Sequence, residues 1–147
     1  MRIVAGRWRG RQIETPDDDR VRPTTDKVRE AWMGIVSRDL PGARVLDLFA
    51  GSGALGLEAL SRGAESVDFV DAAPTSVQLI TRNVEGLGAG SAARVHRADG
   101  LDFAAGLAAG SYDVAFADPP YATAAAVKLA ERWLEVPFAE LFGIEHA

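Results

Sequence analysis

The sequence contains no cysteine, and this absence removes three classes of protein at once. A disulfide scaffold, a cysteine-ligated zinc site and thiol catalysis all need the missing side chain. Only two histidines are present, and neither stands in a recognisable ligand spacing, so we expect no metal. The chain also lacks a run of eighteen apolar residues and an apolar leader. We therefore expect no membrane helix and no signal peptide, with the cytoplasm as the default address.

What is present is the composition of an ordinary globular protein. The chain has 147 residues, of which 48% are hydrophobic and 25% are charged. That length fits one domain and leaves little room for two. We predict a single domain over residues 1–147 that acts as a monomer, with an N-terminal extension at 1–22 and a core at 23–147.

Positive charge is concentrated near the N-terminus, although the net charge of the chain is -5. Residues 1–30 carry eight of the sixteen basic residues against six acidic ones. Arg7, Arg9 and Arg11 surround Trp8, a composition typical of a surface that contacts phosphate and stacks on a base. Short strands at 2–5 and 11–14, separated by glycines, predict a small hairpin here. Taken alone, the segment favours the simpler alternative of a solvated hairpin.

The rest of the chain alternates between strand-like and helix-like segments. A first helix should begin at Thr24 or Thr25 and end before Pro41. Its predicted apolar stripe is Val28, Ala31, Trp32, Ile35 and Val36. Strands are predicted at 44–49, 66–70, 93–98, 112–117 and 141–145, and further helices at 54–62, 75–87 and 122–134. This alternation predicts an α/β fold with a parallel sheet.

A glycine-rich loop lies between the first core strand and its helix. Residues 50–56 contain G-x-G-x-x-G, with a strand before it and a helix after it. Such a loop lets backbone approach a ligand at a helix N-terminus. Asp71 ends the next strand, where a carboxylate can accept both hydroxyl hydrogens of a ribose. The alternative is a tight turn with Asp71 as a helix cap, and the glycines do not distinguish a dinucleotide from S-adenosylmethionine.

Two further acidic residues follow or interrupt predicted strands. Asp47 lies within an apolar strand, where a carboxylate without a partner would be costly. At the carboxyl end of that strand it can reach a cationic amino group or an ordered water. Asp99 follows the third strand and can accept a hydrogen bond from the amine of adenine, although capping a turn is an equal alternative.

The fourth core strand runs directly into Asp118-Pro119-Pro120-Tyr121. Two prolines stiffen the backbone and remove two N–H donors. A carboxylate and a proline carbonyl can then accept both hydrogens of an exocyclic amine while Tyr121 stacks on the base. This arrangement favours a pyramidal nitrogen whose lone pair is aimed at an electrophile. A proline helix start packed by Tyr121 is the structural alternative.

Two segments resemble known families. Asp118 to Tyr121 looks like the D/N-P-P-Y/F signature of S-adenosylmethionine-dependent amino-methyltransferases. Residues 22–30, Arg-Pro-Thr-Thr-Asp-Lys-Val-Arg-Glu, together with the glycine block at 46–63, are similar to the RsmD family of bacterial small-subunit ribosomal RNA guanine-N2 methyltransferases. The resemblance runs from Arg2 to about Glu145.

The resemblance implies a fold, a donor and an acceptor. The fold would be a Rossmann-like class I methyltransferase sheet in the strand order 3-2-1-4-5. The acceptor would be the N2 amine of a guanine in small-subunit ribosomal RNA, within a partly assembled subunit. The implied catalytic residues are Asp118, Pro119, Pro120 and Tyr121. The implied contacts to S-adenosylmethionine are Asp47, Phe49, Ala50, Gly51, Ser52, Gly53, Asp71 and Asp99. The implied RNA contacts are Arg7, Trp8, Arg9, Arg11, Arg22 and Thr24.

The chain departs from the family pattern in two places. Relatives often carry a second acid two residues after the ribose-binding one, where this chain has Ala73. The seven-stranded fold of the family also ends in a hairpin of strands six and seven, which this chain lacks, so we expect a C-terminally truncated core. Two other functions stay open: adenine-N6 methylation of DNA, and RNA binding without catalysis.

Overall fold

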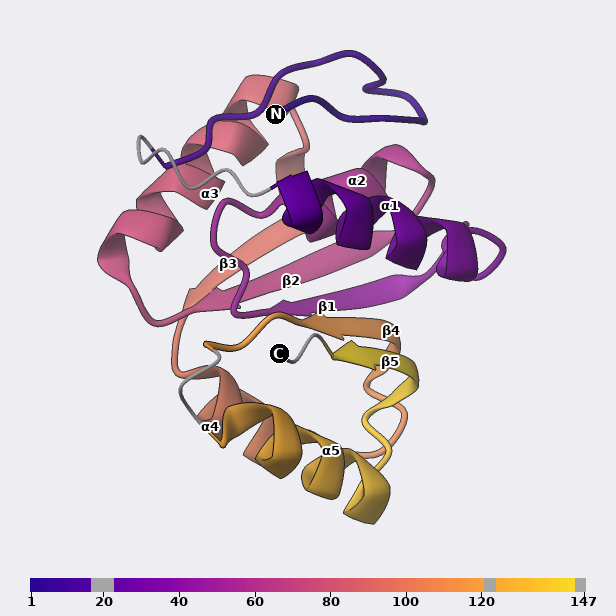
Figure 1. Cartoon of the computed structure of the whole chain (residues 1–147), viewed down its shortest axis with the longest axis vertical. Coiled ribbons are helices and arrows are strands. Elements are labelled where there is room, and N and C mark those ends of the chain that lie inside the picture. The colour runs from indigo at the N-terminus through magenta and orange to yellow at the C-terminus, as the bar shows by residue number, and fades with distance from the viewer. Residues whose placement is uncertain (17–22, 121–123, 145–147) are drawn as a thin grey trace.

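The computed structural model describes residues 1–16, 23–120 and 124–144, without the side chains of residues 23–28. Five strands form one sheet in the order β3-β2-β1-β4-β5, and all neighbouring strands run parallel (Figure 1). This confirms the predicted sheet and its strand order. The strands are β1 (Arg44–Leu48), β2 (Ser66–Asp71), β3 (Ala93–Arg97), β4 (Tyr112–Ala117) and β5 (Ala139–Ile144).

Helices cover both faces of the sheet (Figure 1). One face carries α1 (Pro23–Val36), α2 (Ala54–Ser61) and α3 (Pro74–Leu87), and the other carries α4 (Gly100–Ala105) and α5 (Ala125–Glu135). Neighbouring residues of a strand point to opposite faces, so Val45 joins one buried apolar cluster and Leu46 the other. The central strands β1, β2 and β4 are therefore buried on both faces, as strands of parallel sheets usually are, whereas the edge strands β3 and β5 are partly exposed.

The apolar stripe predicted for α1 is partly correct. Val36 is buried and Trp32 packs against the buried apolar cluster, while the side chain of Val28 lies outside the described residues. Ile35 is 76% exposed and Ala31 is also exposed. The other buried residues are Arg29 and Met33, which precede Val36 by seven and three positions along one face. The apolar pattern of the sequence is compatible with either face of α1. Contact with the sheet selects the face that includes the charged residue Arg29.

One α-helix and the short 3₁₀-helix η1 (Gly90–Ala92) have no counterpart in the sequence prediction. The short α4 follows β3, in a region whose alanines and glycines gave no helical pattern. The side chain of Asp99 caps this helix, because its Oδ1 accepts a hydrogen bond from the Asp102 N–H at 3.0 Å. The turn-capping alternative for Asp99 is thus confirmed.

The N-terminal segment 1–16 lies beside α2 and α3 (Figure 1). Its two arms run antiparallel but form one bridge, Arg2 to Gln12, rather than the predicted strand pair. The backbone N–H groups of Val4 and Ala5 explain this, since they donate to the buried carboxylate of Glu58 at 2.9 and 3.2 Å. Side chains of the core thus replace part of the hairpin ladder.

The helices of the described chain are short. The longest, α1 and α3, have 14 residues each. At about 1.5 Å per residue they are much shorter than the hydrocarbon thickness of a bilayer. Accordingly, no helix within residues 1–16, 23–120 and 124–144 has the length and apolar character to cross a membrane.

Candidate functional site

A pocket lies at the carboxyl edge of the sheet, between β1 and β4. The chain leaves these two neighbouring strands in opposite directions, so they form the topological switch point where open parallel sheets bind ligands. The pocket has a cavity volume of about 150 Å³. It brings together six residues predicted for the site: Asp47, Phe49, Ala50, Gly51, Ser52 and Asp118. It is also lined by Met1, Arg29, Trp32, Ala54 and Leu55.

The loop after β1 has unusual backbone geometry. Phe49 has a φ of 55°, the only positive φ at a non-glycine position among the described residues. Its ring packs against Gly100, where a Cβ would lie 2.7 Å from the ring. Gly51 and Gly53 continue the turn with φ values of 60° and 83°. Strain of this kind is concentrated at ligand sites, and here the packing of Phe49 holds it.

Gly56 shows why the loop must end in a glycine. A Cβ at this position would lie 2.4 Å from the ring of Phe69 on β2, so a larger residue would push α2 away from the sheet. The close approach also brings the Gly56 N–H to Oδ2 of Asp47, at 3.0 Å. The glycine motif thus fixes the carboxylate as well as the turn.

Asp47 is 1% exposed and accepts one hydrogen bond from the residues that the structure describes. Burial raises the pKa of Asp47 to about 8, since the charged form loses its hydration. The Gly56 N–H opposes this rise, while the negative charges of Asp118 and Asp71 add to it. At neutral pH the side chain is therefore mainly protonated, and a cation in the pocket would favour its ionisation.

Asp71 holds the glycine loop in place. Its Oδ2 accepts the Gly51 N–H and its Oδ1 accepts the Ala73 N–H, both at 2.9 Å. The predicted helix-capping alternative therefore describes part of its role, because Ala73 is the N-cap residue of α3. Each carboxylate oxygen retains a further acceptor position for a ligand hydroxyl.

The segment after β4 brings Asp118 to the pocket. Asp118 is partly exposed, Pro119 is buried and Pro120 is exposed. Asp118 lies near enough to Asp47 to raise its pKa, which places both carboxylates around one cavity. Tyr121, the predicted stacking residue, lies outside the described residues.

The basic N-terminal segment is only partly as predicted. Arg7, Arg9 and Arg11 are exposed. Trp8 is 7% exposed and belongs to the buried apolar cluster, so the prediction that its ring stacks on a base is wrong. The Trp8 backbone N–H donates to the Ser61 hydroxyl at 3.0 Å, which ties the N-terminal segment to α2. The Arg7 guanidinium lies over the Trp8 ring, 4.1 Å from the ring centroid.

The structure brings none of three other predicted positions into the described pocket lining, and for two of them it describes no side chain. Asp99 is exposed and caps α4 as described above. Arg22 lies outside the described residues. Thr24 lies in α1, but its side chain lies outside the part of the chain that the structure describes.

Buried polar residues that were not predicted from the sequence join the N-terminal segment to the site. Asn83 donates to the carbonyls of Glu14 and Ser52, both at 3.0 Å, and accepts the Glu14 N–H at 2.7 Å. It therefore ties the glycine loop to the N-terminal segment. Its signal is a polar residue on the apolar face of a helix, which also applies to Glu58 and Arg29.

Comparison with known proteins gives consistent matches. The family model described as "Conserved hypothetical protein 95" matches residues 1–136. The chain is 40% identical over 121 residues to "Ribosomal RNA small subunit methyltransferase D" of Escherichia coli K12, covering 82% of this chain and 60% of that protein. The chain thus spans three fifths of the length of this relative.

Solved structures support the same fold. A hypothetical protein of Thermus thermophilus superposes with a TM-score of 0.78 at 32% identity, covering 99% of this chain and 85% of that one. A SAM-dependent methyltransferase of Agrobacterium tumefaciens superposes with a TM-score of 0.55 at 27% identity, covering 68% and 33%. The architecture is that of a Rossmann-like class I methyltransferase.

Proposed function

Since this chain belongs to the RsmD-like family described as conserved hypothetical protein 95, we propose that it is a ribosomal RNA methyltransferase. The donor is S-adenosylmethionine and the acceptor is the N2 amine of a guanine in small-subunit RNA. One observation carries this proposal: the pocket at the switch point has the glycine loop, Asp47 and Asp118 around a single cavity. The donor end and the acceptor end of a methyl transfer would meet there.

The pocket fits the donor in chemistry. S-adenosylmethionine, when bound, supplies an electrophilic methyl group on a positively charged sulfonium. Asp47 offers a buried carboxyl group that accepts one hydrogen bond from the described residues and is suited to a nearby cation. Asp71 offers acceptor positions for the hydroxyl groups of a ribose. The glycine loop keeps the backbone close to both. The proposed donor contacts are Asp47, Phe49, Ala50, Gly51, Ser52, Gly53, Asp71 and Asp99.

The acceptor end consists of Asp118 and the two prolines that follow it. The Asp118 carboxylate and a proline carbonyl would accept the two hydrogens of the guanine amine, and Tyr121 would stack on the base. Holding the amine in this way turns its lone pair toward the methyl group. Positioning and electrostatics then supply the rate enhancement, with no covalent enzyme intermediate.

RNA would reach the pocket across the N-terminal segment. Arg7, Arg9 and Arg11 are exposed and can contact phosphates, as we propose also for Arg22 and Thr24. Met1 of this segment lines the pocket, so a bound strand would lie next to the site of transfer. A ribosomal RNA substrate would place the protein in the bacterial cytoplasm.

The experiment is methyl transfer from labelled S-adenosylmethionine to unmodified small-subunit RNA, followed by mass mapping of the product. We expect label on the N2 of one guanine. Asp118→Ala should reduce the rate by about a hundredfold or more. Asp113→Ala is the matched control, because Asp113 lies near the other end of β4 in an exposed ion pair with Arg44, and its rate should be unchanged.

Two results would reject the proposed function, and a third would reject the role of Asp118. Label in DNA and none in RNA would favour the adenine-N6 alternative. Binding of RNA without binding of S-adenosylmethionine would favour the noncatalytic alternative. Full activity of Asp118→Ala would remove Asp118 from the reaction.

A further inference from the structure

The pocket contains a buried positive charge that the proposed reaction does not use. Arg29 of α1 lines the pocket and is 5% exposed. Its Nη2 donates to the backbone carbonyl of Arg2 at 3.3 Å. Among the residues that the structure describes, its Nε and Nη1 have no hydrogen-bond partner. Burying guanidinium donors without acceptors is costly, so a partner from outside the chain is expected here.

The charges around the cavity are arranged in a particular way. The cavity borders two acidic side chains, Asp47 and Asp118, and one arginine, Arg29. A ligand with a single negative charge would meet repulsion from the negative charge of Asp118. A ligand carrying both an ammonium and a carboxylate would satisfy the two kinds of side chain together, since guanidinium binds carboxylate through two parallel hydrogen bonds.

We infer that Arg29 binds the α-carboxylate of the amino-acid part of the methyl donor. This inference rests on the proposed function, because it names the residue that recognises one end of the donor. Nε and Nη1 are unpartnered among the described residues, and each forms a parallel donor pair with Nη2, which has two hydrogens. One Nη2 hydrogen would join one of these nitrogens in binding the carboxylate, while the other keeps its bond to the Arg2 carbonyl. Arg29 thus joins the donor pocket to the N-terminal segment through one side chain.

A contact with RNA phosphate explains the same residue less well. Arg29 is buried, and a phosphate on a polymer reaches exposed arginines such as Arg7 and Arg9 more easily. A free amino-acid end is small enough to enter a cavity of about 150 Å³. The position of Arg29 therefore favours the small ligand.

The test compares two ligands that differ in the amino-acid part. S-adenosylhomocysteine carries the carboxylate, whereas 5′-methylthioadenosine has the same nucleoside and lacks it. Binding of both is measured by titration calorimetry for the wild type, Arg29→Met and Arg29→Lys. We expect Arg29→Met to weaken the binding of S-adenosylhomocysteine at least tenfold and to change the affinity for methylthioadenosine less than twofold. Arg29→Lys keeps the positive charge, and its affinity should fall severalfold for S-adenosylhomocysteine and stay unchanged for methylthioadenosine.

Arg44→Met is the matched control, because Arg44 begins β1 at the opposite end of the strand and is ion-paired with Asp113. It should bind both ligands as the wild type does. Equal weakening of both ligands by Arg29→Met would assign Arg29 to the fold rather than to the carboxylate. If Arg29→Met does not fold, unchanged binding by Arg29→Lys would overturn the inference.

The outcomes separate this inference from the proposed function. Selective loss of S-adenosylhomocysteine binding together with no methyl transfer to RNA would support the role of Arg29 and reject the RNA substrate. If the wild type transfers methyl groups to RNA and the Arg29→Met variant binds both ligands normally, the RNA substrate is supported and the role of Arg29 is rejected. A wild type that binds neither ligand would reject both.

Discussion

Two buried aspartates on neighbouring strands differ in how fully the surrounding protein satisfies their hydrogen-bonding capacity. Asp47 on β1 is 1% exposed and Asp68 on β2 is 4% exposed. Asp68 pairs with Leu46 and not with Asp47, so the two side chains point to opposite faces of the sheet. They have the same chemistry and nearly the same burial, and they differ in the donors around them.

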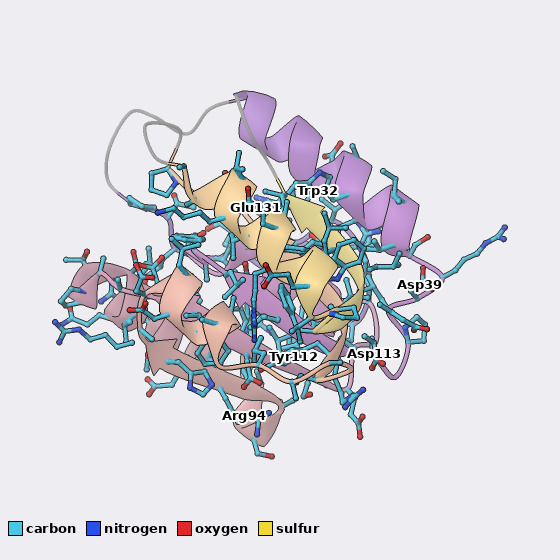
Figure 2. The ribbon with its side chains drawn as sticks, turned by 90° about the horizontal axis from the view of Figure 1, so that it is seen from below. Trp32, Asp39, Arg94, Tyr112, Asp113 and Glu131 are labelled. Atoms are coloured by element: carbon cyan, nitrogen blue, oxygen red, sulfur yellow. The ribbon has the colours of Figure 1, made fainter. Side chains whose placement is uncertain are left out.

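Asp68 is surrounded by donors. It accepts the Tyr112 hydroxyl at 2.7 Å and two Arg94 nitrogens at 2.7 and 3.0 Å, and His96 Nε2 lies at 3.1 Å. Figure 2 labels Tyr112 and Arg94 on this side of the molecule. Burial alone would raise the pKa of Asp68, but the hydrogen bonds from Tyr112, His96 and Arg94 outweigh it, and the pKa falls below its usual value.

Asp47 has one donor from the described residues and a pKa of about 8. Its remaining acceptor positions face a pocket rather than protein donors. The difference between the two aspartates shows that the core is able to satisfy a buried carboxylate fully, and that at Asp47 it does not. Unmet bonding capacity of this kind is characteristic of ligand sites.

The largest expected effect is on the Asp68 side of the comparison. Asp68→Ala leaves the Tyr112 hydroxyl buried without its acceptor and removes the partner of Arg94 and His96. We expect a loss of about 1–4 kcal/mol in the free energy of unfolding, measured by urea denaturation at pH 7, because a buried hydroxyl loses its acceptor and a partly exposed ion pair is removed. Asp113→Ala, which removes an exposed ion pair, should cost less than about 1 kcal/mol. Equal costs would mean that burial of Asp68 adds nothing.

The second prediction concerns the pH dependence that Asp47 creates. In the unfolded chain Asp47 releases its proton near pH 4, and in the folded chain it holds the proton up to about pH 8. The folded state therefore binds more protons between these values, and stability falls as pH rises, by up to about 1.4 kcal/mol per pH unit. Asp47→Asn cannot titrate and should lack this contribution.

The measurement is urea denaturation of both proteins at pH 5, 6 and 7. The difference in unfolding free energy between Asp47→Asn and the wild type should shift in favour of the variant at each step. Parallel pH profiles would show that the pKa of Asp47 is not raised and would remove the contrast with Asp68.

A smaller effect is expected from removing the Tyr112 hydroxyl, which donates a hydrogen bond to Asp68. Tyr112→Phe removes one of its hydrogen bonds and leaves the ring packing in place. We expect a loss of about 1.5 kcal/mol at pH 7, because this hydrogen bond goes to a charged acceptor. The titration of Asp68, followed by NMR of its carboxyl carbon, should move to higher pH in the variant. An unmoved titration would assign the low pKa to the other partners.

The smallest effect is expected at Arg94. Its side chain is 63% exposed, so its ion pair with Asp68 is largely screened by water. Arg94→Met should cost about 0.2–1 kcal/mol in the free energy of unfolding, and the cost should shrink in 1 M salt. A cost as large as that of Asp68→Ala would show that Arg94 alone maintains the charge of Asp68.

Most of the sheet could be predicted from the sequence because its signals are local. Each core strand is a short apolar run between turn residues, and the predicted and observed ranges differ by two residues or fewer. The gathering of Asp47, Gly51 and Asp118 was also predictable, since the carboxyl ends of parallel strands meet at one edge.

What the sequence could not give depends on contacts between distant segments. Trp8 sits among arginines and looks exposed, but its environment is set by Ser61, 53 residues away. The burial of Arg29 depends on which face of α1 meets the sheet. The apolar pattern contains no information about these partners, because it describes each helix or strand separately.

The contact between Phe49 and Gly100 has a consequence for related sequences. The Phe49 ring occupies the space that any side chain at position 100 would need, because a Cβ there would lie only 2.7 Å from the nearest ring atom. A family member that acquires alanine at position 100 is therefore expected to have a residue smaller than phenylalanine at position 49. The two positions should vary together during evolution, although 50 residues of chain separate them.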